Sequence, residues 1–77
     1  MSAIAVRFGL VVRRCRDARG LSQEALADMA GVSRSFISEV ERGTASPSLE
    51  TMQKIADALA EKLSFLIGQY ERTDDPT

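Results

Sequence analysis

Apolar residues recur along this chain every three or four positions, which is the spacing of an amphipathic α-helix. Serine residues that can cap a helix N-terminus, and glycines that can end a helix, interrupt the pattern at intervals. Together these signals predict five helices, over residues 4–18, 23–30, 34–42, 49–60 and 64–70. We therefore expect an all-α fold with five helices.

The second and third helices are joined by a very short turn. Ser22 and Ser33 are good N-caps, and Gly31 is a residue that ends a helix at positive φ. Ile37 and Val40 share one face of the third helix and are expected to dock onto the second helix. Two short helices joined by a turn of about three residues that contains glycine match the description of a helix-turn-helix.

The first helix carries an apolar stripe at helical spacing, which we expect to face the core: Ile4, Phe8, Val12 and Cys15. Gly9 interrupts this helix and should weaken it, by about 1 kcal/mol relative to alanine. Cys15 has two interpretations, a small buried hydrophobe or a redox sensor, and its place on the stripe favours the first.

The last two helices differ in how many apolar residues they carry. The fourth helix has one apolar face, formed by Leu49, Met52, Ile55, Ala56 and Leu59. We expect Ser64 to cap the last helix. We expect Leu63 and Leu66 of this region to pack into the core and complete it. Phe65, Ile67 and Tyr70 would then be exposed in a monomer, which predicts an interface between two copies, unless a wider core covers all three. We expect residues 1–70 to form the domain and the polar residues 71–77 to be a disordered tail.

A polar stripe follows the outer face of the third helix, at relative positions i, i+1, i+4, i+5 and i+8. Its members are Arg34, Ser35, Ser38, Glu39 and Arg42. A helix with a continuous polar stripe that begins at its N-terminus suits the major groove of DNA. There Arg34 can donate two hydrogen bonds to guanine, Ser35 and Ser38 can bond a base or a phosphate, and Glu39 either accepts from cytosine or is an ordinary surface residue.

The run Q-E-A-L-A-D-M-A-G-V-S-R-S-F-I-S-E-V-E-R-G resembles the helix-turn-helix of the phage repressor and Cro superfamily, the XRE family. The resemblance covers about residues 7–67 and implies a compact repressor-like DNA-binding domain. One departure is that the family usually has a glycine after the fourth helix, where this chain has A-L-A-E-K-L. We therefore expect that helix to run on by a residue or two.

The resemblance also implies roles for single residues. An arginine at position 16 pairs in the family with the glutamate that ends the recognition helix, so Arg16 and Glu41 are expected to form a structural ion pair. The residues expected to contact the DNA backbone are Gln23, Ser33, Arg42, Thr44 and Ser46. Gln23 is placed there by the N-terminus of the second helix, where backbone N–H groups favour a phosphate.

Composition excludes several other classes of protein. The 77 residues include no His and one Cys, so neither a disulfide framework within the chain nor a metal site is expected, and no cofactor. The sequence contains no apolar run of about 20 residues and no signal-peptide layout, so we expect a cytoplasmic protein that has no membrane partner. With no His, metal cluster or glycine-rich phosphate loop, we expect no enzyme. The net charge of −1 counts mildly against DNA, but residues 1–22 carry five Arg and one Asp, so the basic charge is concentrated at one end.

The sequence therefore predicts a sequence-specific transcriptional regulator that binds double-stranded DNA as a homodimer. Two copies would pair through the last helix and place two recognition helices about 34 Å apart on a pseudo-palindromic operator. Size and architecture resemble the controller proteins of restriction–modification systems and small phage repressors, and no small-molecule ligand is expected. The alternative is an antitoxin-like module whose apolar last helix binds a different protein.

Overall fold

The computed structural model describes residues 3–73, with side chains described as far as Gly68 in the last helix. Five helices follow one another: α1 (Ala3–Ala18), α2 (Gln23–Ala30), α3 (Arg34–Arg42), α4 (Leu49–Ala58) and α5 (Leu63–Thr73). The described residues contain no β-strand, so the expected all-α fold with five helices is confirmed. None of these helices combines the length and the apolar character needed to cross a membrane.

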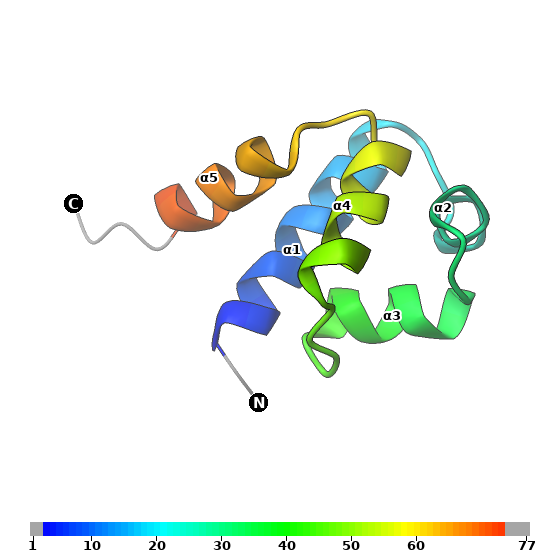
Figure 1. Ribbon diagram of the computed structural model, residues 1–77, viewed down its shortest axis with the longest axis horizontal. Helices are drawn as coiled ribbons and strands as arrows, with labels where there is room; N and C mark the ends of the chain where they lie inside the picture. Colours follow the sequence, from blue (N-terminus) through cyan, green and yellow to red (C-terminus); the bar gives the residue numbers. More distant parts are fainter. Residues whose placement is uncertain (1–2, 74–77) are drawn as a thin grey trace.

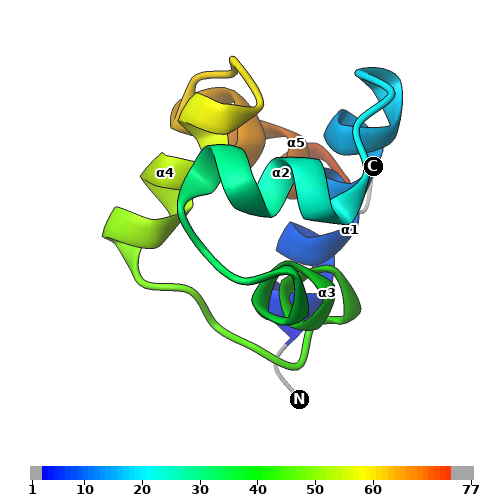
Figure 2. The same ribbon diagram turned by 90° about the vertical axis from the view of Figure 1, so that its right-hand side faces the viewer.

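Helix α1 is the central support of the fold. It packs against α3 on one side and against α5 on another, while α2 packs against both α3 and α4 (Figure 1). Viewed from the side, α3 is seen nearly end-on beneath α2, which runs across the view (Figure 2). The two helices of the helix-turn-helix therefore cross at one end of the molecule, and α5 lies at the other (Figure 1).

The core is formed by the apolar faces that the helical spacing predicts. Its fully buried members come from all five helices and from the residue that follows α4: Val12, Leu26, Ile37, Val40, Ile55, Leu59 and Leu66. Two predicted core residues are exposed instead, Ile4 to 63% and Leu49 to 66%. Each lies in the first turn of its helix, where neighbouring helices no longer cover it. Periodicity alone does not reveal where a stripe leaves the core.

Serine side chains begin three of the helices. The hydroxyl oxygens of Ser22, Ser33 and Ser48 accept hydrogen bonds from backbone N–H groups three residues later, at 3.0, 3.0 and 3.1 Å. Ser64 does not cap α5, because that helix already begins at Leu63. Helix α5 also continues three residues past its predicted end, to Thr73, and the side chain of Tyr70 lies outside the described residues.

Helix α4 ends earlier than predicted, at Ala58 rather than at residue 60. Ala60 adopts a positive φ of 55°, and the next N–H, that of Glu61, donates to the carbonyl of Ala56 at 2.9 Å. This is the chain reversal that a glycine normally supplies at a helix C-terminus. The substitution of glycine by alanine therefore leaves the turn in place and puts the alanine in a conformation that alanine disfavours.

Gly9 is a point of contact between helices rather than a weak point of α1. A Cβ atom added to Gly9 would lie 2.1 Å from the carbonyl oxygen of Val40 and 2.8 Å from that of Glu41. Helix α3 therefore crosses α1 so closely that only glycine fits at the crossing. The expected cost in helix propensity remains, but it is offset by the close packing that glycine allows.

Candidate nucleic-acid interface

The turn between α2 and α3 is fixed by its backbone. Gly31 adopts a φ of 72°, and the N–H of Val32 donates to the carbonyl of Ala27 at 3.0 Å. Val32 is half-buried and packs against the core, which sets the angle at which α3 leaves the turn. The turn comprises residues 31–33, as the sequence predicted.

The outer face of α3 is polar and open to solvent. Arg34, Ser35, Glu39 and Arg42 are exposed, and Ser38 is half-exposed. The inner face of the same helix is fully buried through Ile37 and Val40. The structure thus brings together on one surface the five residues of the predicted polar stripe.

A buried ion pair ties α3 to α1. Arg16 donates from Nε to Oε2 of Glu41 at 2.6 Å and from Nη2 to Oε1 at 3.1 Å, which is the bidentate arrangement. Its Nη1 donates to the carbonyl of Leu21 at 2.7 Å. The side chain of Glu41 is 4% exposed and that of Arg16 is 12% exposed. The hydrogen bond with Glu41 raises the pKa of Arg16 above its ordinary value, although burial works in the opposite direction.

The ion pair continues into two further side chains, a feature that the sequence analysis missed. Gln23, at the start of α2, donates from Nε2 to Oε1 of Glu41 at 3.1 Å. Arg34, at the start of α3, donates from Nη1 to Oε1 of Gln23 at 3.3 Å. Four side chains from α1, α2 and α3 are therefore linked in the order Arg16, Glu41, Gln23, Arg34. Sequence spacing does not indicate these links, because each of them spans at least 11 residues.

The other predicted backbone-contact residues lie at the two ends of α3. The Ser33 hydroxyl accepts a bond from the N–H of Phe36, so its own proton remains free to be donated. The Thr44 hydroxyl already donates to the carbonyl of Glu39 at 3.2 Å, so this group helps to cap the helix. Arg42 and Ser46 are exposed, the latter in the loop that leads to α4.

An open depression surrounds the N-terminus of α2. It is lined by Arg16, Ser22, Gln23, Glu24, Ala25, Asp28 and Arg34. The first N–H groups of α2 and the exposed Arg34 favour an anion here, whereas Arg16 is already paired with Glu41.

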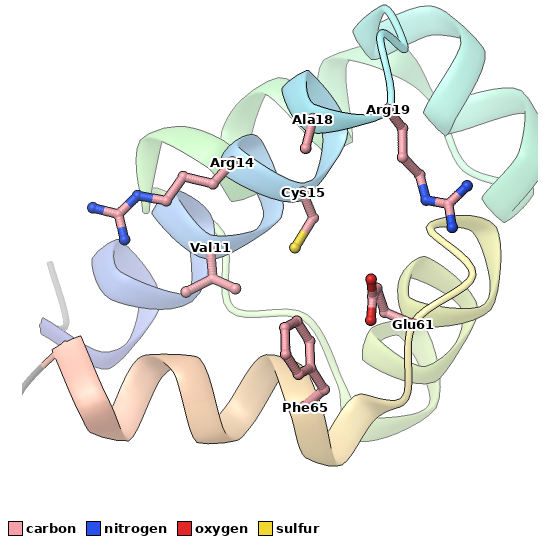
Figure 3. Close-up of a pocket in the computed structure, with 7 residues that line it drawn as sticks. All are labelled: Val11, Arg14, Cys15, Ala18, Arg19, Glu61 and Phe65. Atoms are coloured by element: carbon pink, nitrogen blue, oxygen red, sulfur yellow. The ribbon is translucent and has the colours of Figure 1, made fainter.

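A second hollow lies between α1 and α5, at the other end of the molecule (Figure 3). It has a volume of about 240 Å³. Val11, Cys15 and Phe65 form its apolar part, and Arg19 and Glu61 extend toward one another at one end (Figure 3). Burial, and to a smaller extent the charge of Glu61, raise the pKa of the Cys15 thiol. Cys15 is half-buried and packs against the core, as a small hydrophobe does.

The described residues offer no group of three or more His, Cys, Asp or Glu side chains that could hold a metal ion. The arrangement of α2, the turn and α3 instead defines the class of protein: a helix-turn-helix domain with a polar, solvent-facing second helix.

Comparison with known proteins identifies the family. The family model described as helix-turn-helix matches residues 12–66, which is most of the chain. The control protein C.BamHI of Bacillus amyloliquefaciens is 42% identical over 57 residues, which cover 73% of this chain and 70% of that protein. The crystal structure of the restriction–modification controller protein C.AhdI from Aeromonas hydrophila is 43% identical and superposes with a TM-score of 0.82, covering 84% of this chain and 98% of that one. The chain belongs to the XRE-type helix-turn-helix family, which includes phage repressors and restriction–modification controller proteins.

Other relatives are longer than this chain. The immunity repressor protein of Bacillus phage phi105 is 36% identical over 61 residues, which cover 79% of this chain and 42% of the repressor. A prophage-derived transcriptional regulator of Bacillus subtilis is 35% identical over 68 residues, which cover 87% of this chain and 63% of the regulator. The chain thus spans less than two thirds of both proteins, and it is homologous to transcriptional regulators through their helix-turn-helix part.

Proposed function

We propose that this protein is a sequence-specific transcriptional regulator that inserts α3 into the major groove of double-stranded DNA. The observation that carries the proposal is the outer face of α3, where Arg34, Ser35, Ser38 and Glu39 lie on a helix whose opposite face is buried. Arg34 donates to guanine, the two serines bond bases or phosphates, and Glu39 accepts from cytosine. Because Glu41 anchors α3 to α1, the groove meets a helix that is already held in place.

The remaining contacts go to the DNA backbone. Gln23 and Ser33 lie at the N-termini of α2 and α3, where free N–H groups attract phosphate. Arg42, the last residue of α3, and Ser46, in the loop that follows, are exposed and extend the contact to the next phosphates. Thr44 reaches phosphate only if its hydroxyl leaves the carbonyl of Glu39. Such contacts position the protein without reading the sequence.

The regulator acts as a homodimer on a pseudo-palindromic operator, with α5 at the interface. Phe65 is 45% exposed, Ile67 is 38% exposed, and Leu10 of the adjacent α1 is 40% exposed, so an apolar surface is available at the end of the molecule away from α3. Pairing through α5 places two copies of α3 about 34 Å apart in successive major grooves. The likeness to two controller proteins supports the control of restriction–modification genes as the biological role.

Selection of bound duplexes from a random DNA pool at near-physiological salt tests the proposal. The expected result is an inverted repeat whose half-sites lie about one helical turn apart. In the selected duplex, Arg34→Ala should relax the preference for one base pair by about 1–3 kcal/mol, whereas Arg42→Ala should weaken binding to all duplexes alike. Failure of the folded protein to enrich any sequence would exclude this function.

A second function is favoured by the exposed apolar surface of α5, which can also bind a different protein. In that case the chain is an antitoxin-like module that neutralises a partner. Sedimentation equilibrium of the purified chain distinguishes the two functions. A homodimer that Phe65→Ser dissociates supports the regulator, whereas a monomer at micromolar concentration supports the protein-binding module.

A further inference from the structure

We propose that the hollow between α1 and α5 binds a free α-amino acid with an apolar side chain. Val11, Cys15 and Phe65 contact that side chain, while Arg19 binds the carboxylate and Glu61 the ammonium group. The proposal adds a small-molecule ligand and does not rest on DNA binding, because the hollow lies at the end of the molecule away from α3 (Figure 1). No pattern in the sequence indicates this site, since it forms only where α1 and α5 pack together.

The wall of the hollow is apolar and comes from both helices. Val11 and Cys15 line it from α1, and the ring of Phe65 extends toward them from α5 (Figure 3). Cys15 is half-buried and Phe65 is exposed, so both present apolar surface that a ligand can cover. Removal of such surface from water favours the binding of an apolar group.

Two opposite charges stand at one end of this wall. Arg19, which follows α1, and Glu61, which precedes α5, extend toward one another (Figure 3). Within the described part of the chain, their side chains form no hydrogen bond or ion pair with each other or with another group. Burial raises the pKa of the Cys15 thiol most, Glu61 raises it further and Arg19 lowers it, so both charges act on the apolar wall.

The presence of both charges selects the class of ligand. An anion without a positive group is attracted by Arg19 but repelled by Glu61, and the reverse holds for a simple cation. A zwitterion satisfies both side chains, because Arg19 donates to its carboxylate and Glu61 accepts from its ammonium group. In an α-amino acid one carbon carries both charged groups and the side chain, which can therefore extend along the apolar wall. Arg14 also borders the hollow, but its guanidinium points away from it (Figure 3).

The size of the hollow indicates which amino acids fit. Its volume of about 240 Å³ is smaller than the roughly 300–1,000 Å³ of pockets that hold drug-sized ligands. At about 30 Å³ for each water molecule, this volume corresponds to about eight waters. That number is close to the number of non-hydrogen atoms in leucine, isoleucine or methionine. These three amino acids are therefore the expected ligands.

A titration with leucine, followed by heteronuclear NMR of the isotopically labelled chain, tests the proposal because it detects weak binding and locates it. Two compounds with the same apolar skeleton are the controls: isocaproate lacks the ammonium group, and isoamylamine lacks the carboxylate. For leucine we expect saturable shifts of the backbone amides around the hollow, with a Kd on the order of 1 mM. Each control should bind at least about fivefold more weakly than leucine.

Substitutions of the two charged residues test their separate roles. Arg19→Gln and Glu61→Gln should each weaken leucine binding about three- to tenfold. Glu61→Gln should at the same time bind isocaproate more tightly, because it removes the repulsion of that anion. Arg13→Gln is the matched control, since Arg13 is an exposed residue of α1 that does not line the hollow, and it should leave the Kd for leucine unchanged. Thermal melting of each variant establishes that it is folded.

Several results would overturn the proposal. They are the absence of saturable shifts up to about 10 mM leucine, shifts confined to residues outside α1 and α5, and equal affinity for leucine and isocaproate. A dilution series of the unliganded chain adds a further test. If the amide of Phe65 shifts with protein concentration and does not respond to leucine, a second copy of the chain occupies the hollow and the proposal is wrong.

A bound amino acid should also weaken self-association, because Phe65 belongs both to the hollow and to the proposed dimer surface. This consequence rests on the proposed homodimer. Sedimentation equilibrium at saturating leucine should show a dimer Kd raised at least about threefold, and an unchanged value would refute the competition for Phe65. A chain that is monomeric without leucine would instead refute the homodimer, while the NMR titration still decides whether the hollow binds the amino acid.

Discussion

Replacement of Gly9 by alanine should destabilise the fold even though alanine is the better helix former. At this crossing an added Cβ would lie 2.1 Å from the carbonyl oxygen of Val40, whereas real Cβ contacts shorter than 3.0 Å are essentially not found. Helices α1 and α3 would thus have to separate locally by about 0.9 Å, the difference between those distances. The neighbouring atoms are backbone carbonyls of α3, which cannot rotate away as a side chain can.

Two opposing contributions determine the size of the effect. Overpacking of a core commonly costs about 1–3 kcal/mol, and the backbone partners place Gly9 at or above the upper end of that range. Helix propensity returns about 1 kcal/mol when glycine becomes alanine. We therefore expect Gly9→Ala to lower the free energy of unfolding by about 2 kcal/mol, or the melting temperature by about 8–16 °C for a domain of this size.

The chain provides a matched control for this substitution. Gly68 also lies within a helix, but an added Cβ there meets no atom within 4 Å. Gly68→Ala should raise the free energy of unfolding by about 1 kcal/mol, through helix propensity alone. The assay is urea unfolding followed by circular dichroism, at two protein concentrations so that any change in self-association appears as a shift of the midpoint with concentration. If both substitutions raised stability equally, α1 and α3 could not cross as closely as described.

Three further substitutions or measurements test other parts of the structure. Glu41→Ala leaves Arg16 partly buried without its carboxylate and should lower the free energy of unfolding, measured by thermal melting, by about 3–5 kcal/mol. Glu39→Ala, on the exposed face of α3, should change that free energy by less than about 0.5 kcal/mol. Equal effects of the two substitutions would contradict the structural role of the Arg16–Glu41 pair. Ala60→Gly should raise the free energy of unfolding by about 0.5–1 kcal/mol, because glycine adopts a φ of 55° without the strain that alanine has there. A urea unfolding midpoint that moves to a lower concentration would show that Ala60 is not strained in this turn. Burial raises the pKa of the Cys15 thiol, so this thiol should be alkylated with a higher pH midpoint in the folded chain than in urea. Since the folded state holds that proton more tightly, the contribution of Cys15 to stability is complete below the unfolded pKa of the thiol and is lost as the pH rises through the folded pKa. Identical alkylation midpoints would show that the thiol is not buried.

Much of the fold could be predicted from local signals. Helices α2 and α3 begin and end at the predicted residues, because Ser22, Ser33, Gly31 and Gly43 act on backbone groups within a few positions of themselves. The inner face of α3 was equally predictable, since Ile37 and Val40 share one side of any helix built from this segment. The polar outer face that carries the proposed function follows from the same periodicity.

Other features depended on which helices meet. Ile4 and Leu49 continue apolar stripes that the neighbouring helices do not cover, and Gly9 is required at a crossing with a segment more than 30 positions away. The turn after α4 forms with Ala60 at positive φ, because packing of the flanking helices outweighs the local preference of alanine.

The sequence by itself therefore determined the helices, the helix-turn-helix and the polar surface of α3, because hydrogen bonds and periodicity within one segment specify all three. Only the tertiary structure decided how the side chains of different helices combine. The expected pairing of Arg16 with Glu41 came from the family, but the continuation through Gln23 to Arg34 appears only once α1, α2 and α3 are packed together. The physical reason is that a hydrogen bond requires its partners within about 3 Å, and separation along the chain carries no information about such a distance between helices.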